Sequence, residues 1–218
     1  MASSSAITQV LETDIWVKAT WEEFLAFAED STWEKGKFYY YEQHMRVEMS
    51  PVGPLHGRQN SIIPYVIILF ATFRNIRVVQ FTNTSFRKAG IGEFQPDLAY
   101  YIGADLRVPP DDSNSVVDLN IYDPPSLVVE IGASSFNDDL GGKRLLYESA
   151  GIREYWVDRA NTREIFAFAI NGKSSGRIEN SLVLPGLEIA LIEEALNRSL
   201  TEDDGAINRW LIQTFSQG

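Results

Sequence analysis

Two acidic residues stand where a carboxylate is costly to bury. Glu130 lies inside the apolar run Leu127-Val128-Val129-Glu130-Ile131, where an ionised carboxylate loses hydration and needs a cation, strong donors or a raised pKa to compensate. Asp97 opens a second apolar segment. If the two segments are strands that pair antiparallel, the start of one lies beside the end of the other. We therefore expect Asp97 and Glu130 to meet at one edge of a sheet.

Two converging carboxylates repel each other unless one is protonated or a cation lies between them. A Mg²⁺ or Mn²⁺ ion bound by two acidic oxygens, a backbone carbonyl and waters would remove that repulsion. The carbonyl of Ile131, directly after Glu130, is well placed to be a further ligand. The two acids thus predict a site for a hard divalent cation.

A lysine follows at a useful distance in the sequence. Asp139, Lys143 and Tyr147 have i, i+4, i+8 spacing, which places them on one face of the helix expected there. Lys143 could then reach back over the carboxylate pair. Glu48, as a third acid at the edge of the site, and His56, as a phosphate or water contact, are secondary candidates.

Simpler interpretations stand beside these. Asp97, which follows Pro96, could begin a strand through turn chemistry alone. Glu130 could belong to a buried salt bridge whose partner is Lys143 itself. Asp139 and Lys143 could form no more than a surface i, i+4 pair worth roughly 0.2–0.5 kcal/mol. The residue types alone leave these alternatives open.

The elements that must position these residues follow from hydrophobic spacing and turn residues. The central unit, residues 125–158, reads as a strand, a loop, a helix and a second strand. Helices are expected over Trp21–Glu29, Leu55–Arg74, with a kink or a delayed start at Pro64, and Ala206–Phe215. Further strands are expected within Lys37–Ser50 as a hairpin, and over Arg77–Arg87, Phe94–Ile102, Thr162–Ala169 and Ser181–Leu184, with a long connection over Gly103–Asp123.

Length and composition set further limits. A chain of 218 residues, 44% of them hydrophobic, is most simply a single domain over residues 1–218, with an N-terminal arm over about 1–19 and a helical extension over about 197–218. It contains no cysteine and two histidines, so thiolate metal sites are excluded and a histidine-rich zinc site is disfavoured. No secretory signal or run of about 18 apolar residues is present, so we expect a cytoplasmic protein with no membrane partner.

The formal net charge is −11. Affinity for nucleic acid comes largely from Lys and Arg contacts to phosphates. A nucleic-acid function would therefore need a local basic patch or bridging metal ions.

The motifs together resemble a known family. Pro96-Asp97, Leu127-Val128-Val129-Glu130, Asp139 with Lys143 and Tyr147, and Gly151-Ile152-Arg153-Glu154-Tyr155-Trp156-Val157-Asp158 are similar to the Uma-type restriction endonucleases of the PD-(D/E)XK nuclease superfamily. The resemblance extends to Glu48-Met49-Ser50-Pro51 with His56 and to Leu184-Pro185-Gly186-Leu187, so it covers about residues 20–195.

The resemblance implies an α/β fold with a restriction-endonuclease-like core, a central mixed β-sheet flanked by helices, and here an additional N-terminal helix and β-hairpin. It also implies hydrolysis of DNA phosphodiester bonds with Mg²⁺ or Mn²⁺. Asp97 and Glu130 would hold the metal, while Lys143 would orient the attacking water and stabilise charge on the phosphate. One departure matters: Gly132 stands where the superfamily has a lysine, two residues after the strand acid, so that role passes to Lys143.

Three functions fit these observations. The first is a metal-dependent endonuclease acting on DNA. The second is a non-catalytic binding or regulatory protein on a nuclease-like fold, and the third is a structural protein in which Asp97, Glu130 and Lys143 form a buried ion-pair network. A homodimer is a reasonable assembly because two-fold pairing is the commonest one.

Overall fold

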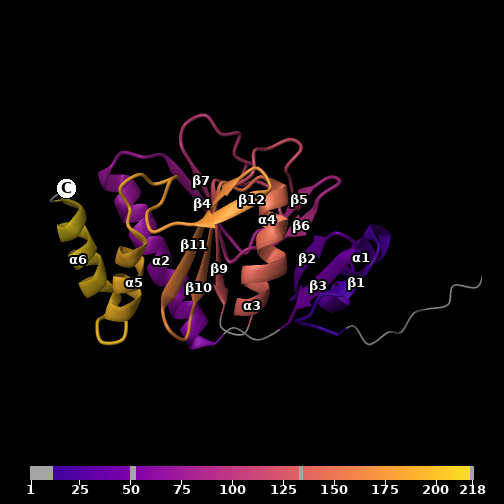
Figure 1. Cartoon of the computed structure of the whole chain (residues 1–218), viewed down its shortest axis with the longest axis horizontal. Helices are drawn as coiled ribbons and strands as arrows, with labels where there is room; N and C mark the ends of the chain where they lie inside the picture. The colour runs from indigo at the N-terminus through magenta and orange to yellow at the C-terminus, as the bar shows by residue number, and fades with distance from the viewer. Residues whose placement is uncertain (1–11, 50–52, 133–134, 217–218) are drawn as a thin grey trace, which may run out of the picture.

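The computed structural model describes residues 12–49, 53–132 and 135–216, which form two six-stranded sheets with helices around them (Figure 1). The first sheet, in spatial order, contains β1 (Val17–Lys18), β3 (His44–Glu48), β2 (Lys37–Tyr41), β6 (Gly92–Phe94), β5 (Phe86–Lys88) and β8 (Val117–Asp118). The second contains β12 (Ser174–Arg177), β11 (Glu164–Asn171), β10 (Glu154–Arg159), β9 (Leu127–Gly132), β7 (Leu98–Ile102) and β4 (Val78–Thr82).

The second sheet is the mixed central sheet that the sequence predicted. Strands β9 and β10 pair in parallel, and the remaining neighbours pair antiparallel. Every residue of β9 is buried, because both faces of the sheet are covered at this strand; apart from Glu130 its side chains are apolar, as is usual for a strand covered on both faces. The expected N-terminal helix and hairpin are α1 (Trp21–Ala28) and β2–β3, and the hairpin belongs to a separate sheet.

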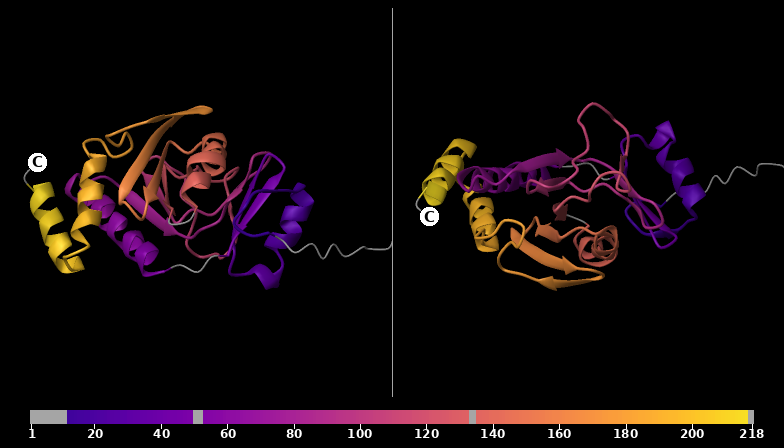
Figure 2. Two further views of the ribbon diagram at one scale, coloured as in Figure 1. Left: turned by 60° about the horizontal axis from the view of Figure 1, so that its bottom comes forward. Right: turned by 90° about the horizontal axis from the view of Figure 1, so that it is seen from above.

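The helices divide between the two faces of the central sheet (Figure 2). One face is covered by α2 (Pro54–Phe73) and α5 (Ile189–Arg198), and α6 (Asp204–Ser216) packs against α2; the three helices share one hydrophobic cluster with the strands. The other is covered by α3 (Phe136–Asp138), a π turn (Asp139–Lys143) and α4 (Arg144–Ala150). A short 3₁₀ turn, Ser31–Trp33, follows α1.

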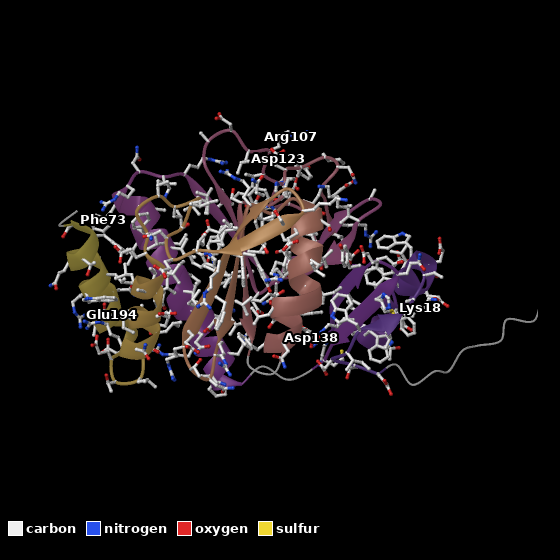
Figure 3. The ribbon with its side chains drawn as sticks, in the orientation of Figure 1. Lys18, Phe73, Arg107, Asp123, Asp138 and Glu194 are labelled. Carbon is white, nitrogen blue, oxygen red and sulfur yellow. The ribbon has the colours of Figure 1, made fainter. Side chains whose placement is uncertain are left out.

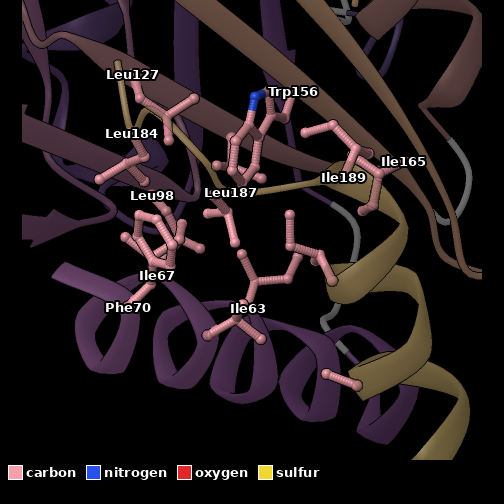
Figure 4. Close-up of a cluster of buried hydrophobic side chains, with 14 of the residues drawn as sticks. Ile63, Ile67, Phe70, Leu98, Leu127, Trp156, Ile165, Leu184, Leu187 and Ile189 are labelled. Carbon is pink, nitrogen blue, oxygen red and sulfur yellow. The ribbon is translucent and has the colours of Figure 1, made fainter. Parts of the chain in front are cut away.

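Helix α2 packs a broad apolar face onto the sheet. Ile63, Ile67 and Phe70 project from it toward Leu98 and neighbouring core residues (Figure 4). Fully burying an aliphatic side chain of this kind stabilises the fold by about 1.5–3 kcal/mol relative to exposure. This packing explains why the helix continues through Pro64, although an interior proline costs about 3 kcal/mol. The helix begins at Pro54, so the expected delay of its start to Pro64 is not seen.

The ends of the chain take part in this architecture. Residues 1–11 of the expected arm lie outside the described residues, but Val17 and Lys18 form β1, which pairs with Met45 and His44 of β3. At the other end, Phe215 of α6 lies 5.4 Å from the ring of Phe70 on α2. The C-terminal helices therefore complete the core on the α2 face.

The strand expected over Arg77–Arg87 is wrong as one element. It divides into β4 and β5, which belong to different sheets. Asn83, between them, adopts a left-handed backbone conformation with φ of 49°, which ends a strand. At this turn the chain leaves the central sheet and enters the first sheet, which contains the β2–β3 hairpin.

The strand expected over Phe94–Ile102 also divides, into β6 and β7. Pro96 lies between them, and a proline has no N–H to donate to a strand ladder. Because of this break, Asp97 lies directly before β7 and contributes its side chain to the candidate site described below.

The strand expected over Ser181–Leu184 is not formed; the edge strand is β12 instead, joined to β11 by a turn at Asn171 and Gly172. The carboxylate of Glu154 accepts the backbone N–H groups of Leu182 and Val183 at 2.8 and 3.1 Å. Those donors are therefore unavailable to a ladder. Residues 50–52, between the hairpin and α2, lie outside the described residues.

Candidate active site

The predicted meeting of the two acids is confirmed by the strand pairing. Strands β7 and β9 are antiparallel, with Leu98 opposite Val129. The next position outward in this register places Asp97 opposite Glu130. Both side chains are buried, at 3% and 2% exposure, so two carboxylates come together at one end of the central sheet.

Asp97 is surrounded by donors. Its Oδ2 accepts the backbone N–H of Ile131 at 2.8 Å, and its Oδ1 is contacted by His56 Nε2 at 3.1 Å and by the ammonium of Lys37. Burial raises the pKa of Asp97, but the contacts with His56 and Lys37 outweigh burial, so its pKa is held below the usual range. Asp97 is therefore a carboxylate.

Glu130 is in the opposite situation. Its Oε1 accepts hydrogen bonds from Tyr39, at 3.1 Å, and from Tyr147. Burial is the largest influence and raises the pKa of Glu130 to about 8; Lys143 opposes this shift and Asp97 adds to it. The positive charge of Lys143 therefore only partly offsets the cost of burying the Glu130 carboxylate.

The ammonium of Lys143 lies among the carboxylates of Glu48, Asp139 and Glu130, which we call the acidic ring. Its Nζ lies 2.9 Å from Glu48 Oε1, 2.9 Å from Asp139 Oδ1 and 3.6 Å from Glu130 Oε1. It also lies 4.2 Å from the centre of the Tyr39 ring. Burial lowers the pKa of Lys143, but the surrounding carboxylates raise it well above the usual value, so the ammonium is charged.

Lys143 reaches this position through a local departure from α-helical geometry. The expected regular helix over Asp139–Tyr147 is wrong in its first half, which is a π turn that contains Gly141 at φ −103° and ψ −106°. π turns are rare and are frequent at functional sites. The turn still brings Asp139 and Lys143 together as an i, i+4 pair, and both are buried; the alternative of a surface pair is wrong.

The hairpin of the first sheet contributes an arginine, Arg46 of β3, that contacts the acidic ring. Arg46 Nε donates to Glu48 Oε1 at 2.8 Å, and Arg46 Nη1 lies 3.0 Å from Asp138 Oδ2. Asp138 is placed at the start of the α3–α4 segment, on the side near the hairpin (Figure 3). Burial raises the pKa of Glu48, but Lys143 and Arg46 together hold that pKa below its usual value, so Glu48 is charged as well.

Gly132 has a steric reason to be glycine. A Cβ at this position would lie 2.7 Å from Asp139 Oδ2 and 3.0 Å from the Cα of Phe136. No lysine fits there without displacing backbone. The ammonium of Lys143, delivered from the π turn, comes instead to the acid two residues earlier on the same strand.

All six candidate side chains converge at this end of the sheet: Asp97, Glu130, Lys143, Glu48, His56 and Asp139. Sequence reasoning missed Lys37 and Tyr39, which touch the two central acids. A signal for Lys37 was present, because the hairpin register places it opposite Glu48. Of the alternatives, the buried salt bridge between Glu130 and Lys143 is present, at 3.6 Å.

The donor chemistry suits a hard cation. Asp97 and Glu130 supply carboxylate oxygens, and the Ile131 carbonyl is the adjacent backbone oxygen; Mg²⁺ and Mn²⁺ prefer such donors. Within the described ranges, no group of three acidic or histidine side chains is arranged to hold an ion unaided. An ion here would therefore need the Ile131 carbonyl and waters to complete its coordination.

A family model described as "Putative restriction endonuclease", Uma2, matches residues 21–206. The chain belongs to the Uma2 family. The match to the Uma2 model covers the hairpin, both acids, Lys143 and the start of α6. The acidic ring therefore lies wholly within the matched residues.

A solved structure has the same fold as this Uma2 chain. It is described as a putative nuclease belonging to DUF820 from Anabaena variabilis, with a TM-score of 0.54 and 17% sequence identity, over 80% of this chain and 97% of the other. No match was found among curated proteins. The family match supports a nuclease function for the Uma2 chain, and the neighbour shows its fold.

Proposed function

We propose that this protein is a divalent-metal-dependent endonuclease that hydrolyses phosphodiester bonds in DNA. One observation carries the proposal: Asp97 and Glu130 come together across the β7–β9 pair, with the ammonium of Lys143 3.6 Å from Glu130. Membership of a restriction endonuclease family supports it. Paired acids next to a buried lysine are suited to phosphodiester hydrolysis because they can bind a metal and stabilise negative charge.

The roles follow from the surroundings of each group. Asp97, Glu130 and the Ile131 carbonyl would hold Mg²⁺ or Mn²⁺, which when bound lowers the pKa of water and polarises a phosphate oxygen. Lys143 is charged and faces Glu130, so it would orient the attacking water and stabilise charge that develops on the phosphate. Tyr39 and Tyr147 hold the Glu130 carboxylate in place through their hydroxyl groups.

The outer residues position the inner ones. Glu48 and Asp139 each lie 2.9 Å from Lys143 Nζ, so they hold its ammonium in the charged form. His56 and Lys37 hold Asp97 as a carboxylate. Lys37 pairs with Asp97, so a metal ion bound to Asp97 would have to compete with this ammonium or accommodate it.

A second function is favoured by that same contact. In a non-catalytic binding or regulatory protein, Lys37 and Lys143 would permanently neutralise the acids, and the nuclease-like fold would serve only recognition. The ion pairs of Lys37 with Asp97 and of Lys143 with three carboxylates fit such a closed network. The two functions differ in whether metal enters and DNA is cut.

The experiment is a cleavage assay on supercoiled plasmid, linear duplex and single-stranded DNA, each with Mg²⁺, Mn²⁺ or a chelator. We expect cleavage of DNA with either metal, none with chelator, and none by Glu130→Gln. Glu194→Gln, an exposed glutamate on α5, is the matched control and should cut normally. DNA binding without cleavage by the folded wild type would favour the non-catalytic function and reject the nuclease.

Among the described helices, none is long and apolar enough to cross a membrane. Purified protein allows both the proposed DNA substrate and the homodimer expected from the sequence to be tested directly.

A further inference from the structure

Two arginines and two phenylalanines form a continuous row on the α4 face of the central sheet. The guanidinium carbon of Arg177 lies 4.2 Å from the centre of the Phe166 ring, and that of Arg159 lies 5.0 Å from the Phe136 ring. The two rings meet edge to face, with centres 5.1 Å apart. We call Arg159, Phe136, Phe166 and Arg177 the arginine–phenylalanine row.

The row begins next to the acidic site. Arg159 is the last residue of β10 and pairs with Gly132 on β9, two residues beyond Glu130. The Cα of Phe136 lies 3.0 Å from where a Cβ of Gly132 would be. From there the row extends across β11 to Arg177 on the edge strand β12. A polymer lying on the row would thus pass the strand end that carries the two acids.

No strong ion pair occupies either guanidinium group, so both positive charges are available to a ligand. Arg177 is exposed and, in the described part of the chain, takes part in no ion pair. Arg159 has one, Glu164, at 3.7 Å, in a pair whose side chains are 48% and 53% exposed. An exposed pair of this kind contributes little, about 0.2–1 kcal/mol at best. Two such arginines are notable in a chain whose net charge is −11.

The rings limit where the guanidinium groups can lie. Stacking on an aromatic face holds the planar group flat and leaves its N–H edge directed outward. Such an edge fits the two oxygens of a phosphate group. Phosphate contacts carry no base information, so contact of the row with the DNA backbone would be independent of DNA sequence.

We propose that the arginine–phenylalanine row binds the sugar–phosphate backbone of DNA beside the acidic site. This inference rests on the proposed function for its choice of DNA as the ligand. It also supplies the local basic surface that an acidic nuclease needs, since phosphate contacts provide most of the sequence-independent affinity.

The test is binding of a short fluorescein-labelled DNA duplex by fluorescence anisotropy, in chelator so that no cleavage occurs, over a series of salt concentrations. The variant is Arg159→Gln/Arg177→Gln. Each lost phosphate contact should weaken binding roughly eightfold at about 0.1 M salt, and lower the magnitude of the salt slope by about 0.9, because affinity varies as salt to the power −0.9 per contact. Unfolding of each variant by urea shows that it is folded.

A matched control comes from the opposite side of the molecule. Arg198 on α5 also lies 4.2 Å over an aromatic ring, that of Trp210, but it pairs with Glu194 and Glu202. Glu194 lies far from Asp138 in Figure 3. Arg198→Gln should bind DNA like the wild type.

The outcomes separate this inference from the proposed function. Wild-type affinity and salt slope in the double variant, or no salt-dependent DNA binding by the wild type, would overturn the row as a DNA surface. If the double variant loses binding while the wild type cuts nothing with any metal, the row stands and the nuclease is rejected. If cleavage is metal-dependent and equal in both, the nuclease stands and the row is rejected.

Discussion

Gly132 and Asp139 approach so closely that no side chain fits between them: a Cβ on Gly132 would lie 2.7 Å from Asp139 Oδ2. Asp139 cannot easily move, because Ser135 Oγ donates to its Oδ2 at 2.7 Å and Lys143 holds its Oδ1. The position at which the PD-(D/E)XK resemblance implies a lysine is therefore closed to that side chain here. The contact links the shape of strand β9 to the placement of Lys143.

Gly132→Ala should destabilise the fold. Because the added methyl group meets both Asp139 and the backbone of Phe136, we expect a loss of about 1–3 kcal/mol, typical of overpacking. Gly176→Ala is the control, since a Cβ there meets nothing within 4 Å. Urea unfolding measures both variants. Equal stability of the two alanine variants would show that the contact with Asp139 is not restrictive.

Lys143→Met should abolish cleavage and also destabilise the protein, because three carboxylates would lose their buried cation. Breaking a buried ion pair in this way costs about 3–5 kcal/mol. Lys143→Met/Asp139→Asn removes one negative charge together with the positive one, so we expect it to recover part of the stability and none of the cleavage. Recovery of cleavage in the double variant would contradict a role for the ammonium.

Lys37→Met should strengthen metal binding. Lys37 pairs with Asp97 Oδ1, and a metal ion would have to displace or accommodate that ammonium. We expect a lower Kd for Mn²⁺ and lower stability of the metal-free variant, since Asp97 then keeps, among the described residues, only His56 and the Ile131 N–H as partners. Weaker Mn²⁺ binding would instead indicate that Lys37 supports the metal-bound form.

Asp158 predicts a pH dependence of stability. It is fully buried on β10, both of its carboxylate oxygens lack a hydrogen-bond partner among the described residues, and burial raises its pKa to about 7. Because the folded pKa is above the unfolded one, the stability linked to this group is full below about pH 4 and is lost as pH rises toward 7.

Asp158→Asn removes that loss. The unfolding free energy of Asp158→Asn, relative to wild type, should therefore increase between about pH 4 and pH 7 and then level off. Glu130, whose pKa is also raised, is present in both proteins and cancels in the comparison. Urea unfolding at a series of pH values provides the measurement, and a difference that does not change with pH would refute the assignment.

The sequence predicted what depends on local pattern and pairing. The antiparallel meeting of Asp97 with Glu130 follows from two apolar segments that carry an acid at opposite ends, and the hairpin and α2 follow from periodicity. It could not predict features set by tertiary contact. The π turn before Lys143 and the lost strand at Ser181–Leu184 depend on buried packing and on the Glu154 carboxylate.

The candidate site shows the same division. Lys37 was missed although its strand register faces Glu48, because a lysine at the start of an aromatic strand is usually a solvated residue. The row of Arg159 and Arg177 joins residues from two strands through rings on α3 and β11, and no spacing in the sequence indicates it.

The central claim is that Asp97 and Glu130 share one divalent cation, and isothermal titration of Mn²⁺ into the metal-free protein tests it most directly. We expect one site in the wild type, and loss of that site in both Asp97→Asn and Glu130→Gln, with each variant still folded by circular dichroism. No binding to the wild type, or unchanged binding to either variant, would contradict the claim.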